Sequence, residues 1–149
     1  MSQAADRIDL ETSIGYALKE AASALRLAME TVLRPLGLTI TEYSCLELLA
    51  QHPGLSNSDL ARGAFVTRQS MSVLLQALER DGLVSRPAEA PVGKVLPTRL
   101  TPQGRTSLDA ASTAVRAVEL RMLSGMTADE QAVALAGLQS MIRSLHTDE

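Results

Sequence analysis

The sequence predicts a mainly α-helical protein with one small antiparallel β pair, because helical patterns cover most of its 149 residues. Three observations carry this prediction. Two capped helix starts lie close together in the middle of the chain, at Ser56 and Thr67. Two short strand-like runs follow them, separated by a loop rich in Pro and Gly. Long amphipathic patterns, with apolar residues three and four positions apart, occupy both ends of the chain.

The two central helix starts predict a helix-turn-helix. Ser56 is placed to cap a helix whose third residue is Asp59, so that the hydroxyl and the carboxylate each accept a backbone N–H. Thr67 is placed to cap a second helix after a short connection over residues 63–66. The second helix has an apolar face and an opposite polar face. A helix of this size has the dimensions to enter a DNA major groove. The apolar face is Met71, Leu74, Leu75 and Leu78, and the polar face is Arg68, Gln69, Ser72 and Gln76.

The segment after the second helix predicts a wing. Gly82 is expected to end the helix in the left-handed conformation, which glycine adopts without steric cost. Residues 83–86 are expected to form a short strand, residues 87–93 a loop and residues 94–100 a returning strand. Pro102 then suits the first turn of a new helix. Helix, strand, loop and strand is the order of a winged helix.

Two helices are predicted before the central segment. The first covers residues 11–34 and ends at Pro35, and its apolar residues form a heptad-like stripe. The second covers residues 40 to about 51 and begins with a capping box of Thr39 and Glu42. The stripe on the first helix comprises Ile14, Leu18, Ala21, Leu25, Ala28 and Val32.

Two more helices are predicted at the C-terminal end. One begins at Pro102 and is broken at Ser124 and Gly125, and the other begins with a capping box of Thr127 and Glu130. Together with the first helix they present more apolar surface than one small domain needs, so we expect an intertwined symmetric dimer. Their stripes comprise Leu108, Ala111, Val115, Val118 and Met122, and then Val133, Ala136, Leu138, Met141, Ile142 and Leu145.

Composition narrows the classes of function. The chain has 46% hydrophobic residues, but no apolar run comes near the roughly eighteen residues that span a bilayer. Its N-terminus lacks a signal pattern, so a cytoplasmic location is expected. One cysteine excludes an internal disulfide and a cysteine-built metal site, and two distant histidines form no metal motif. No phosphate loop or catalytic signature occurs, so neither an enzyme nor a cofactor is expected.

The distribution of charge favours a nucleic-acid partner, although the net charge of −3 does not. From Arg62 to Arg105 the chain has seven basic and three acidic residues, a net charge of +4. The remainder has seven basic and fourteen acidic residues, a net charge of −7. Such an asymmetry is typical of a local phosphate-binding surface on an acidic scaffold.

Three segments occur in a fixed order between residues 37 and 108, and they read LTITEYSCLELLAQHPGLSNSDLA, VTRQSMSVLLQALERDGLV and RLTPQGR. In this order and at this spacing they resemble the MarR family of winged-helix transcriptional regulators. The resemblance implies a single MarR-like domain over residues 1–149 and a winged helix-turn-helix DNA-binding lobe over residues 37–101. Dimerisation helices are then expected over residues 11–36 and 102–149.

The resemblance also implies a function. The family pattern is a sequence-specific, dimeric DNA-binding repressor that a small-molecule ligand releases from its operator by favouring a spacing of recognition helices that misfits DNA. The expected partners are therefore double-stranded DNA, a second copy of the chain and a small effector. Two recognition helices on successive major-groove turns need a pseudo-palindromic operator with half-sites about ten base pairs apart.

The candidate DNA contacts lie on both central helices and on the wing. Arg68 at the start of the second helix can bind a guanine edge or a phosphate, and Gln69 and Gln76 suit adenine. Ser56, Ser58 and the N–H groups of the helix that begins there can hold phosphates. For each residue alone, a solvated surface position is a respectable alternative. The full set is Ser56, Ser58, Thr67, Arg68, Gln69, Ser70, Ser72, Gln76, Arg86, Lys94 and Arg99.

The wing tip departs from the family pattern. MarR relatives commonly carry an Asp-Arg pair there, and the matching positions are Val92 and Gly93. Lys94 is the charged residue left at the tip, and Pro97 interrupts the returning strand. Minor-groove contact is therefore expected to be weaker or to pass to Lys94, with Arg86 and Arg99 serving phosphates.

Tyr16 and Tyr43 are the candidate effector-binding residues, with plain core packing as a near-equal alternative. Two other functions stay open. One is a redox-switched repressor that uses Cys45, although this cysteine lies in an apolar helix with no basic residue between residues 35 and 61 to lower the pKa of its thiol. The other is a winged-helix dimer that binds protein and has no specific DNA site.

Overall fold

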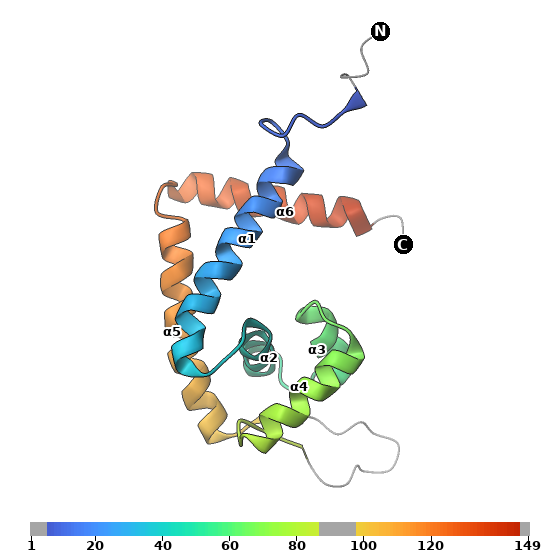
Figure 1. The fold of residues 1–149 in the computed structure, drawn as a ribbon, viewed down its shortest axis with the longest axis vertical. Helices are drawn as coiled ribbons and strands as arrows, with labels where there is room; N and C mark the ends of the chain where they lie inside the picture. Colours follow the sequence, from blue (N-terminus) through green and yellow to red (C-terminus); the bar gives the residue numbers. More distant parts are fainter. Residues whose placement is uncertain (1–5, 87–97, 147–149) are drawn as a thin grey trace. The chain divides into compact units, whose positions relative to one another are not determined.

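A computed structural model describes residues 6–86 and 98–146. It divides into two compact units, Met1–Val115 and Arg116–Glu149. The elements are helical apart from one pair of short strands (Figure 1). In chain order they are α1 (Ile14–Leu33), the 3-10 helix η2 (Arg34–Leu36), α2 (Ile40–Gln51), α3 (Asn57–Gly63), α4 (Arg68–Arg80), β1 (Val84–Ser85), β2 (Arg99–Leu100), α5 (Pro102–Met122) and α6 (Ala128–His146).

The helix starts on the N-terminal side follow local capping chemistry. The N–H groups of Glu42 and Thr39 form the reciprocal hydrogen bonds of the expected capping box at α2, at 3.1 and 2.9 Å. The expected start of α1 at residue 11 is wrong by three residues. Ser13 caps the helix instead, because its hydroxyl accepts the N–H of Tyr16 at 3.1 Å. At the other end Gly37 adopts φ +75° and turns the chain from η2 toward α2.

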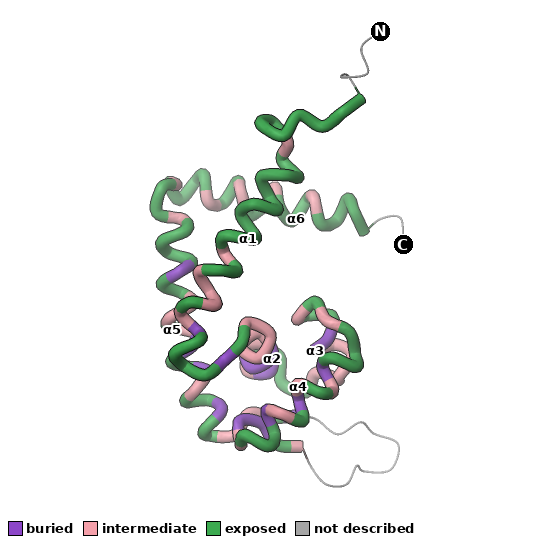
Figure 2. The backbone as a smooth tube through the Cα atoms, viewed as in Figure 1, coloured by how far each residue is buried: buried purple, intermediate pink, exposed green. Residues whose placement is uncertain are grey.

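The helix-turn-helix prediction is confirmed by α3 and α4. Ser56 and Asp59 form a capping box at α3, and Thr67 caps α4 by accepting the N–H of Ser70 at 3.0 Å. Gly82 ends the segment with φ +78°, as expected. The apolar faces of α2, α3 and α4 meet in one core, which Figure 2 shows as buried segments of these helices. Its most buried side chains include Leu33, Cys45, Leu46, Leu60, Met71, Leu75 and Leu78.

The wing is described only at its base. Val84 pairs with Leu100 and Ser85 with Arg99 in an antiparallel ladder. Both strands are therefore shorter within the described residues than the sequence predicts. The predicted loop and most of the returning strand, including Val92, Gly93, Lys94 and Pro97, lie outside the described residues.

The start of α5 is joined to the end of α4 through backbone groups. The hydroxyl of Thr101 donates to the carbonyl of Gly82 at 2.6 Å, and its N–H donates to the carbonyl of Leu83 at 3.1 Å. The same hydroxyl accepts the N–H of Gly104 at 3.0 Å. A Cβ at Gly104 would overlap the carbonyl oxygen of Leu83, so the two segments approach as closely as a glycine allows.

The C-terminal unit contains α6, which begins with the expected capping box. Thr127 accepts the N–H of Glu130 at 3.1 Å, and Glu130 accepts the N–H of Thr127 at 2.8 Å. No residue of α6 is buried within the described chain, and Val133 and Leu145 are 72% and 80% exposed.

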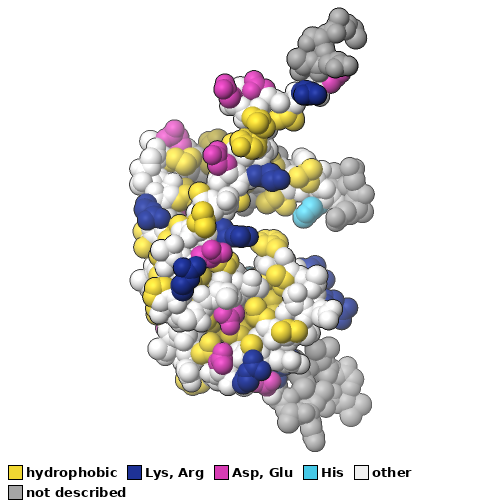
Figure 3. Space-filling view, viewed as in Figure 1, with side chains coloured by type: hydrophobic (Ala, Val, Ile, Leu, Met, Phe, Trp, Pro, Cys, Tyr) yellow, Lys and Arg dark blue, Asp and Glu magenta, His cyan; other side chains and the backbone are white. Residues whose placement is uncertain are grey.

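Apolar side chains also reach the surface in the first half of α1 (Figure 3). Ile14 and Leu18 are among the exposed ones. Within the described residues, no helix is long and apolar enough to cross a membrane.

Candidate DNA-binding interface

The helix α4 presents its polar face to the surface at its N-terminal end. Its apolar residues Met71, Leu75 and Leu78 are buried, so the helix is held by its back. The cap residue Thr67 is exposed and also donates from its hydroxyl to Ser70 Oγ at 3.0 Å. The exposed residues of α4 are Arg68, Gln69, Ser70, Val73, Gln76, Glu79 and Arg80.

Ser72 is half-buried in α4 and is bonded to a residue of the neighbouring helix α3. Its hydroxyl oxygen accepts a hydrogen bond from Asn57 Nδ2 at 2.7 Å. Asn57 is the first residue of α3, so this bond fixes the start of α3 against the middle of α4. Sequence reasoning missed Asn57, because the two residues are fifteen positions apart and only the packing of the helices brings them together. Ser72 therefore serves first as a link between the two helices.

The serines before and within α3 also differ in their freedom to bind phosphate. The hydroxyl of Ser56 accepts the N–H of Asp59 at 3.1 Å. The hydrogen bonds from Ser56 hold the pKa of the Asp59 carboxyl below its ordinary value, and the adjacent Arg62 lowers it further. Ser58 is half-buried in the first turn of α3. A phosphate at this helix end would meet the Asp59 charge as well as the N–H groups, so the site is less favourable than the pattern suggested.

The described wing base adds two arginines. Arg86 lies 3.5 Å from Glu79, so its charge is partly compensated by the end of α4. Arg99 is exposed and lines a cleft of about 390 Å³ together with Arg105 of α5 and the Pro53–Gly54 turn. Arg105 belongs to the basic segment between Arg62 and Arg105, and its place beside Arg99 makes it a further candidate contact that sequence reasoning missed.

Cys45, the residue of the redox-switch alternative, lies in α2. Cys45 is fully buried, and burial, with a smaller effect from the charge of Glu42, raises the pKa of its thiol to about 12. A thiol with this pKa is protonated at neutral pH, and only the thiolate is a good nucleophile toward peroxide. The burial of Cys45 and the raised pKa of its thiol therefore argue against the redox-switch alternative.

Among the described residues, Tyr43 lines a cleft of about 210 Å³ that Tyr16 does not line. Tyr16 is 48% exposed in the first turn of α1. Tyr43 is half-buried in α2, where its hydroxyl donates to Glu47 Oε2 at 2.7 Å. Burial raises the pKa of Glu47, but hydrogen bonds from Gln51, Tyr43 and Ser112 outweigh it and lower the pKa overall. Tyr43 thus belongs to a polar cluster at the edge of the core.

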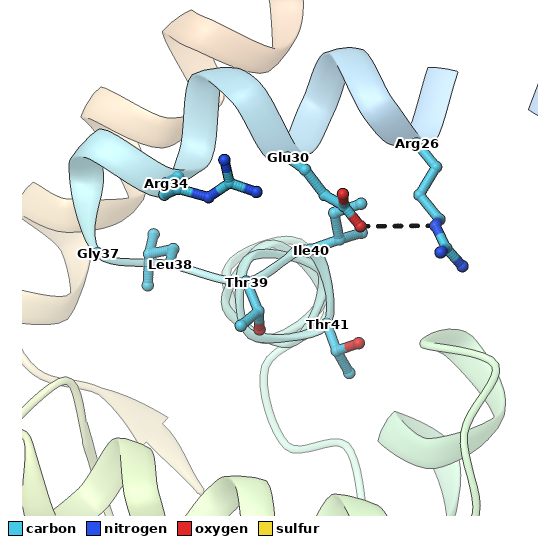
Figure 4. A pocket seen from close by; sticks show the side chains of 8 residues that line it. All are labelled: Arg26, Glu30, Arg34, Gly37, Leu38, Thr39, Ile40 and Thr41. Carbon is cyan, nitrogen blue, oxygen red and sulfur yellow. Dashed lines mark ion pairs between the residues drawn. The ribbon is translucent and has the colours of Figure 1, made fainter. Parts of the chain in front are cut away.

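Another cleft, larger than the one at Arg99 and Arg105, lies where α1 ends and α2 begins. It has a volume of about 640 Å³ (Figure 4). Arg26 and Glu30 come from α1 and lie 3.5 Å apart, and Arg34 follows in η2. The opposite wall is the segment Gly37–Thr41, which leads into the first turn of α2. Two arginines against one carboxylate give this cleft a positive charge, and neither predicted tyrosine lines it.

These features define the class of winged helix-turn-helix DNA-binding proteins. They are the capped helix α4 with its polar face outward, the helix α3 packed against it, and the paired strands at the base of the wing. In the part of the chain that the structure describes, no group of three His, Cys, Asp or Glu side chains can hold a metal ion.

Known proteins share this architecture and much of the sequence. A model of the MarR family matches residues 36–94. The HTH-type transcriptional repressor Rv2887 of Mycobacterium tuberculosis is 43% identical over 121 residues, which cover 81% of this chain and 87% of that protein. Its structure with DNA covers 91% of this chain and 99% of that one, at 38% identity and a TM-score of 0.69.

Two ligand complexes are also similar. The structure of Rv2887 with salicylic acid has 41% identity and a TM-score of 0.71 and covers 87% of this chain and 96% of that one. The transcriptional repressor CouR bound to p-coumaroyl-CoA has 29% identity and a TM-score of 0.77, with coverage of 90% and 94%. The chain therefore belongs to the MarR family, and it is a DNA-binding transcriptional regulator.

Proposed function

We propose that this protein is a dimeric repressor that reads a pseudo-palindromic operator with α4 and leaves it when a small carboxylic acid binds. The carrying observation is the N-terminal end of α4, where Arg68, Gln69 and Ser70 are exposed beside a satisfied cap while the back of the helix is buried. Arginine and glutamine side chains at this end of a recognition helix can form bidentate hydrogen bonds with purine edges. The DNA complex of the relative Rv2887 supports the same use of the fold.

The proposal assigns different tasks to the polar residues. Arg68, Gln69 and Gln76 contact base edges, whereas Thr67 and Ser70 contact the phosphates beside the helix start. Arg99 and Arg105 bind phosphates at the wing base, where they line one cleft. Ser72 holds α3 against α4 through Asn57. Lys94 remains a proposed wing contact outside the described residues.

The exposed apolar surface supports a dimer. Val133, Ile142 and Leu145 of α6 are 72%, 54% and 80% exposed, and Ile14 of α1 is 66% exposed. Apolar side chains in this number on one chain favour association with a second copy, because their burial removes them from water. A symmetric dimer also presents two copies of α4 to one duplex.

Fluorescence anisotropy on the DNA upstream of the protein's own gene tests the proposal. Wild type, Arg68→Ala and Arg80→Ala are titrated at several salt concentrations on this duplex and on a scrambled one. Arg80 is exposed at the other end of α4, so its loss changes the charge equally without removing the proposed base contact. We expect Arg68→Ala to lose about 10- to 100-fold in affinity for the upstream duplex, and Arg80→Ala to lose much less.

The salt series separates two contacts of Arg68. Loss of a phosphate contact lowers the slope of log affinity against log salt by about 0.9, whereas loss of a base contact removes the preference over the scrambled duplex. Equal, weak binding of wild type to both duplexes, with no site recovered from genomic fragments, would contradict the proposal and favour the protein-binding alternative.

The effector site is proposed to be the cleft between α1 and α2. Arg26 and Arg34 supply guanidinium groups that can bind a carboxylate, and the Leu38 and Ile40 side chains supply apolar wall. The cleft joins a helix with exposed apolar residues to the first helix of the DNA-binding lobe. A ligand that binds it better in one arrangement of these helices shifts the population toward that arrangement. The complexes of Rv2887 with salicylic acid and of CouR with p-coumaroyl-CoA support an aromatic acid or its thioester as the ligand class.

Salicylate is the probe for this site. It is titrated into the preformed complex with DNA, for wild type, Arg34→Ala and Arg143→Ala, the last being an exposed arginine on α6. We expect release of wild type and Arg143→Ala, and a shift of about tenfold or more to higher salicylate concentration for Arg34→Ala. Release of Arg34→Ala at the wild-type concentration would place the ligand elsewhere.

A further inference from the structure

Phe65 combines an exposed aromatic ring with an unusual backbone conformation. The residue lies in the turn between α3 and α4, and its side chain is 92% exposed. Its φ angle is +60°, and it is the one non-glycine residue with positive φ in the described part of the chain. Side chains with a Cβ rarely adopt this region, because the Cβ approaches the following carbonyl oxygen.

Two glycines in the same chain show what this position ordinarily requires. The N–H of Phe65 donates to the carbonyl of Arg62, and the next N–H donates to the carbonyl of Ala61, at 3.2 and 3.0 Å. The same pair of bonds, three and five residues back, occurs at Gly37 and Gly82, which have φ +75° and +78°. All three are Schellman motifs, in which glycine is the usual residue after the helix.

The strain at Phe65 is therefore not compensated by the fold of the single chain. A glycine would satisfy the same hydrogen bonds, as it does at Gly37 and Gly82, and the exposed ring gains almost no burial in return. Strained residues of this kind occur at functional sites, where the conformation directs a side chain toward a partner.

The position of Phe65 indicates which partner this is. It stands two residues before the cap Thr67 and three before Arg68, at the end of α4 that the proposed function directs into the major groove. The neighbouring Arg68 is an exposed cation, which favours a polyanion over an apolar protein surface. Arg62 is exposed too, but it is paired with Asp59. The apolar surface proposed for the second copy lies instead on α1 and α6.

We propose that the Phe65 ring is a DNA contact that packs against apolar atoms of the duplex beside the α4 N-terminus, and so contributes to affinity at that position. The inference rests on the proposed function of α4. The apolar atoms that DNA offers there are the C5 methyl groups of thymine, which line the major groove, and the C–H groups of deoxyribose. The left-handed backbone holds the ring outside the fold, where it can reach them.

The test compares Phe65→Gly, Phe65→Tyr and Arg68→Ala with wild type on the upstream duplex, by anisotropy and thermal unfolding. Phe65→Gly removes both the ring and the strain, so we expect a higher Tm together with about tenfold weaker DNA binding. Phe65→Tyr keeps the ring and is expected to bind within about twofold of wild type. Sedimentation is expected to show an unchanged oligomeric state for both.

A duplex with deoxyuridine in place of thymine distinguishes the two sources of apolar contact. If the ring packs on a methyl group, wild type weakens on this duplex and Phe65→Gly does not. If it packs on deoxyribose, the duplex weakens neither, and Phe65→Gly stays about tenfold weaker than wild type on both.

Three results would overturn the inference. Phe65→Gly that binds like wild type while Arg68→Ala binds weakly would reject the Phe65 contact alone. A dimer that dissociates in Phe65→Gly would assign the ring to a second copy instead. Absence of sequence preference in wild type would reject the proposed function together with this contact.

Discussion

Two parts of this chain carry similar amphipathic patterns but differ in what covers their apolar faces. In α2, α3 and α4 the large apolar residues are packed within the chain, and Leu46, Leu60, Met71 and Leu78 have no exposed surface. In α6 no residue is buried within the described chain. Helical spacing predicted both faces equally well, because spacing indicates which side chains share a face and says nothing about what covers it.

The difference assigns a separate physical role to each part. A lobe with its own core can hold α4 rigidly, as readout of base edges requires. A helix with an uncovered apolar face needs a second surface, which we propose is the same helix region of another copy. The lobe of α2, α3 and α4 should then stay folded when dilution separates the dimer into monomers. The stability of α6 should instead depend on protein concentration.

The largest expected effect is loss of the dimer when charge is placed on α6. Leu138→Glu with Ile142→Glu puts two carboxylates on the exposed apolar face of this helix. We expect the dimer dissociation constant to rise about 100-fold or more, because each of the two side chains contributes through burial in both copies. Analytical ultracentrifugation measures it, with Gln139→Glu as the control on the same helix. An unchanged dimer would show that the interface lies away from α6.

The next effect concerns the joint between α4 and α5. Gly104→Ala places a Cβ on the carbonyl oxygen of Leu83, so either the start of α5 or the turn after α4 has to move. We expect a loss of about 3 kcal/mol in unfolding free energy, measured by urea denaturation. Gly15→Ala is the matched control, since it also lies in a first helical turn but meets only Ser13 Oγ at 3.8 Å. Equal stability of the two variants would mean that the joint is not tightly packed.

A pH dependence follows from the buried thiol in the core of the lobe. The pKa of Cys45 is raised from 9.0 to about 12, so above pH 9 the unfolded chain loses this proton while the folded chain keeps it. Stability due to this group is fully present below pH 9 and is lost at about 1.4 kcal/mol for each pH unit above it. Urea unfolding between pH 8 and pH 10.5 measures the slope for wild type and Cys45→Ala. Identical slopes would show that the thiol is not buried in solution.

The smallest effect compares the same substitution in the two parts. Thr39→Ala and Thr127→Ala each remove the hydroxyl of a capping box, at α2 and α6 respectively. Each should cost about 1 kcal/mol. The cost of Thr39→Ala should be independent of protein concentration, whereas the cost of Thr127→Ala should appear in the dimer dissociation constant. Thermal unfolding over a range of protein concentrations separates them, and the opposite pattern would reverse the roles assigned to the two parts.

Features set by neighbouring residues were predictable from the sequence. Caps at Thr39, Ser56 and Thr67 each depend on a residue three positions later, and the left-handed Gly82 depends only on its missing Cβ. The start of α1 was misplaced because the amphipathic pattern extends before the cap at Ser13.

Features set by packing were not predictable. Asn57 and Ser72 are hydrogen-bonded although they are fifteen positions apart. Arg99 and Arg105 line one cleft although no sequence pattern relates them. The left-handed conformation of Phe65 was not predictable for another reason. Glycine is the residue that indicates this conformation in a sequence, and a phenylalanine gives no such indication.

The central claim is that two copies of α4 read one duplex, and selection of bound DNA from a random duplex library tests it most directly. The account predicts enrichment of an inverted repeat whose half-sites are about ten base pairs apart. It further predicts that Arg68→Ala loses one conserved position in each half-site, symmetrically, while the spacing stays the same. Enrichment of a single asymmetric site, or of no sequence at all, would contradict it.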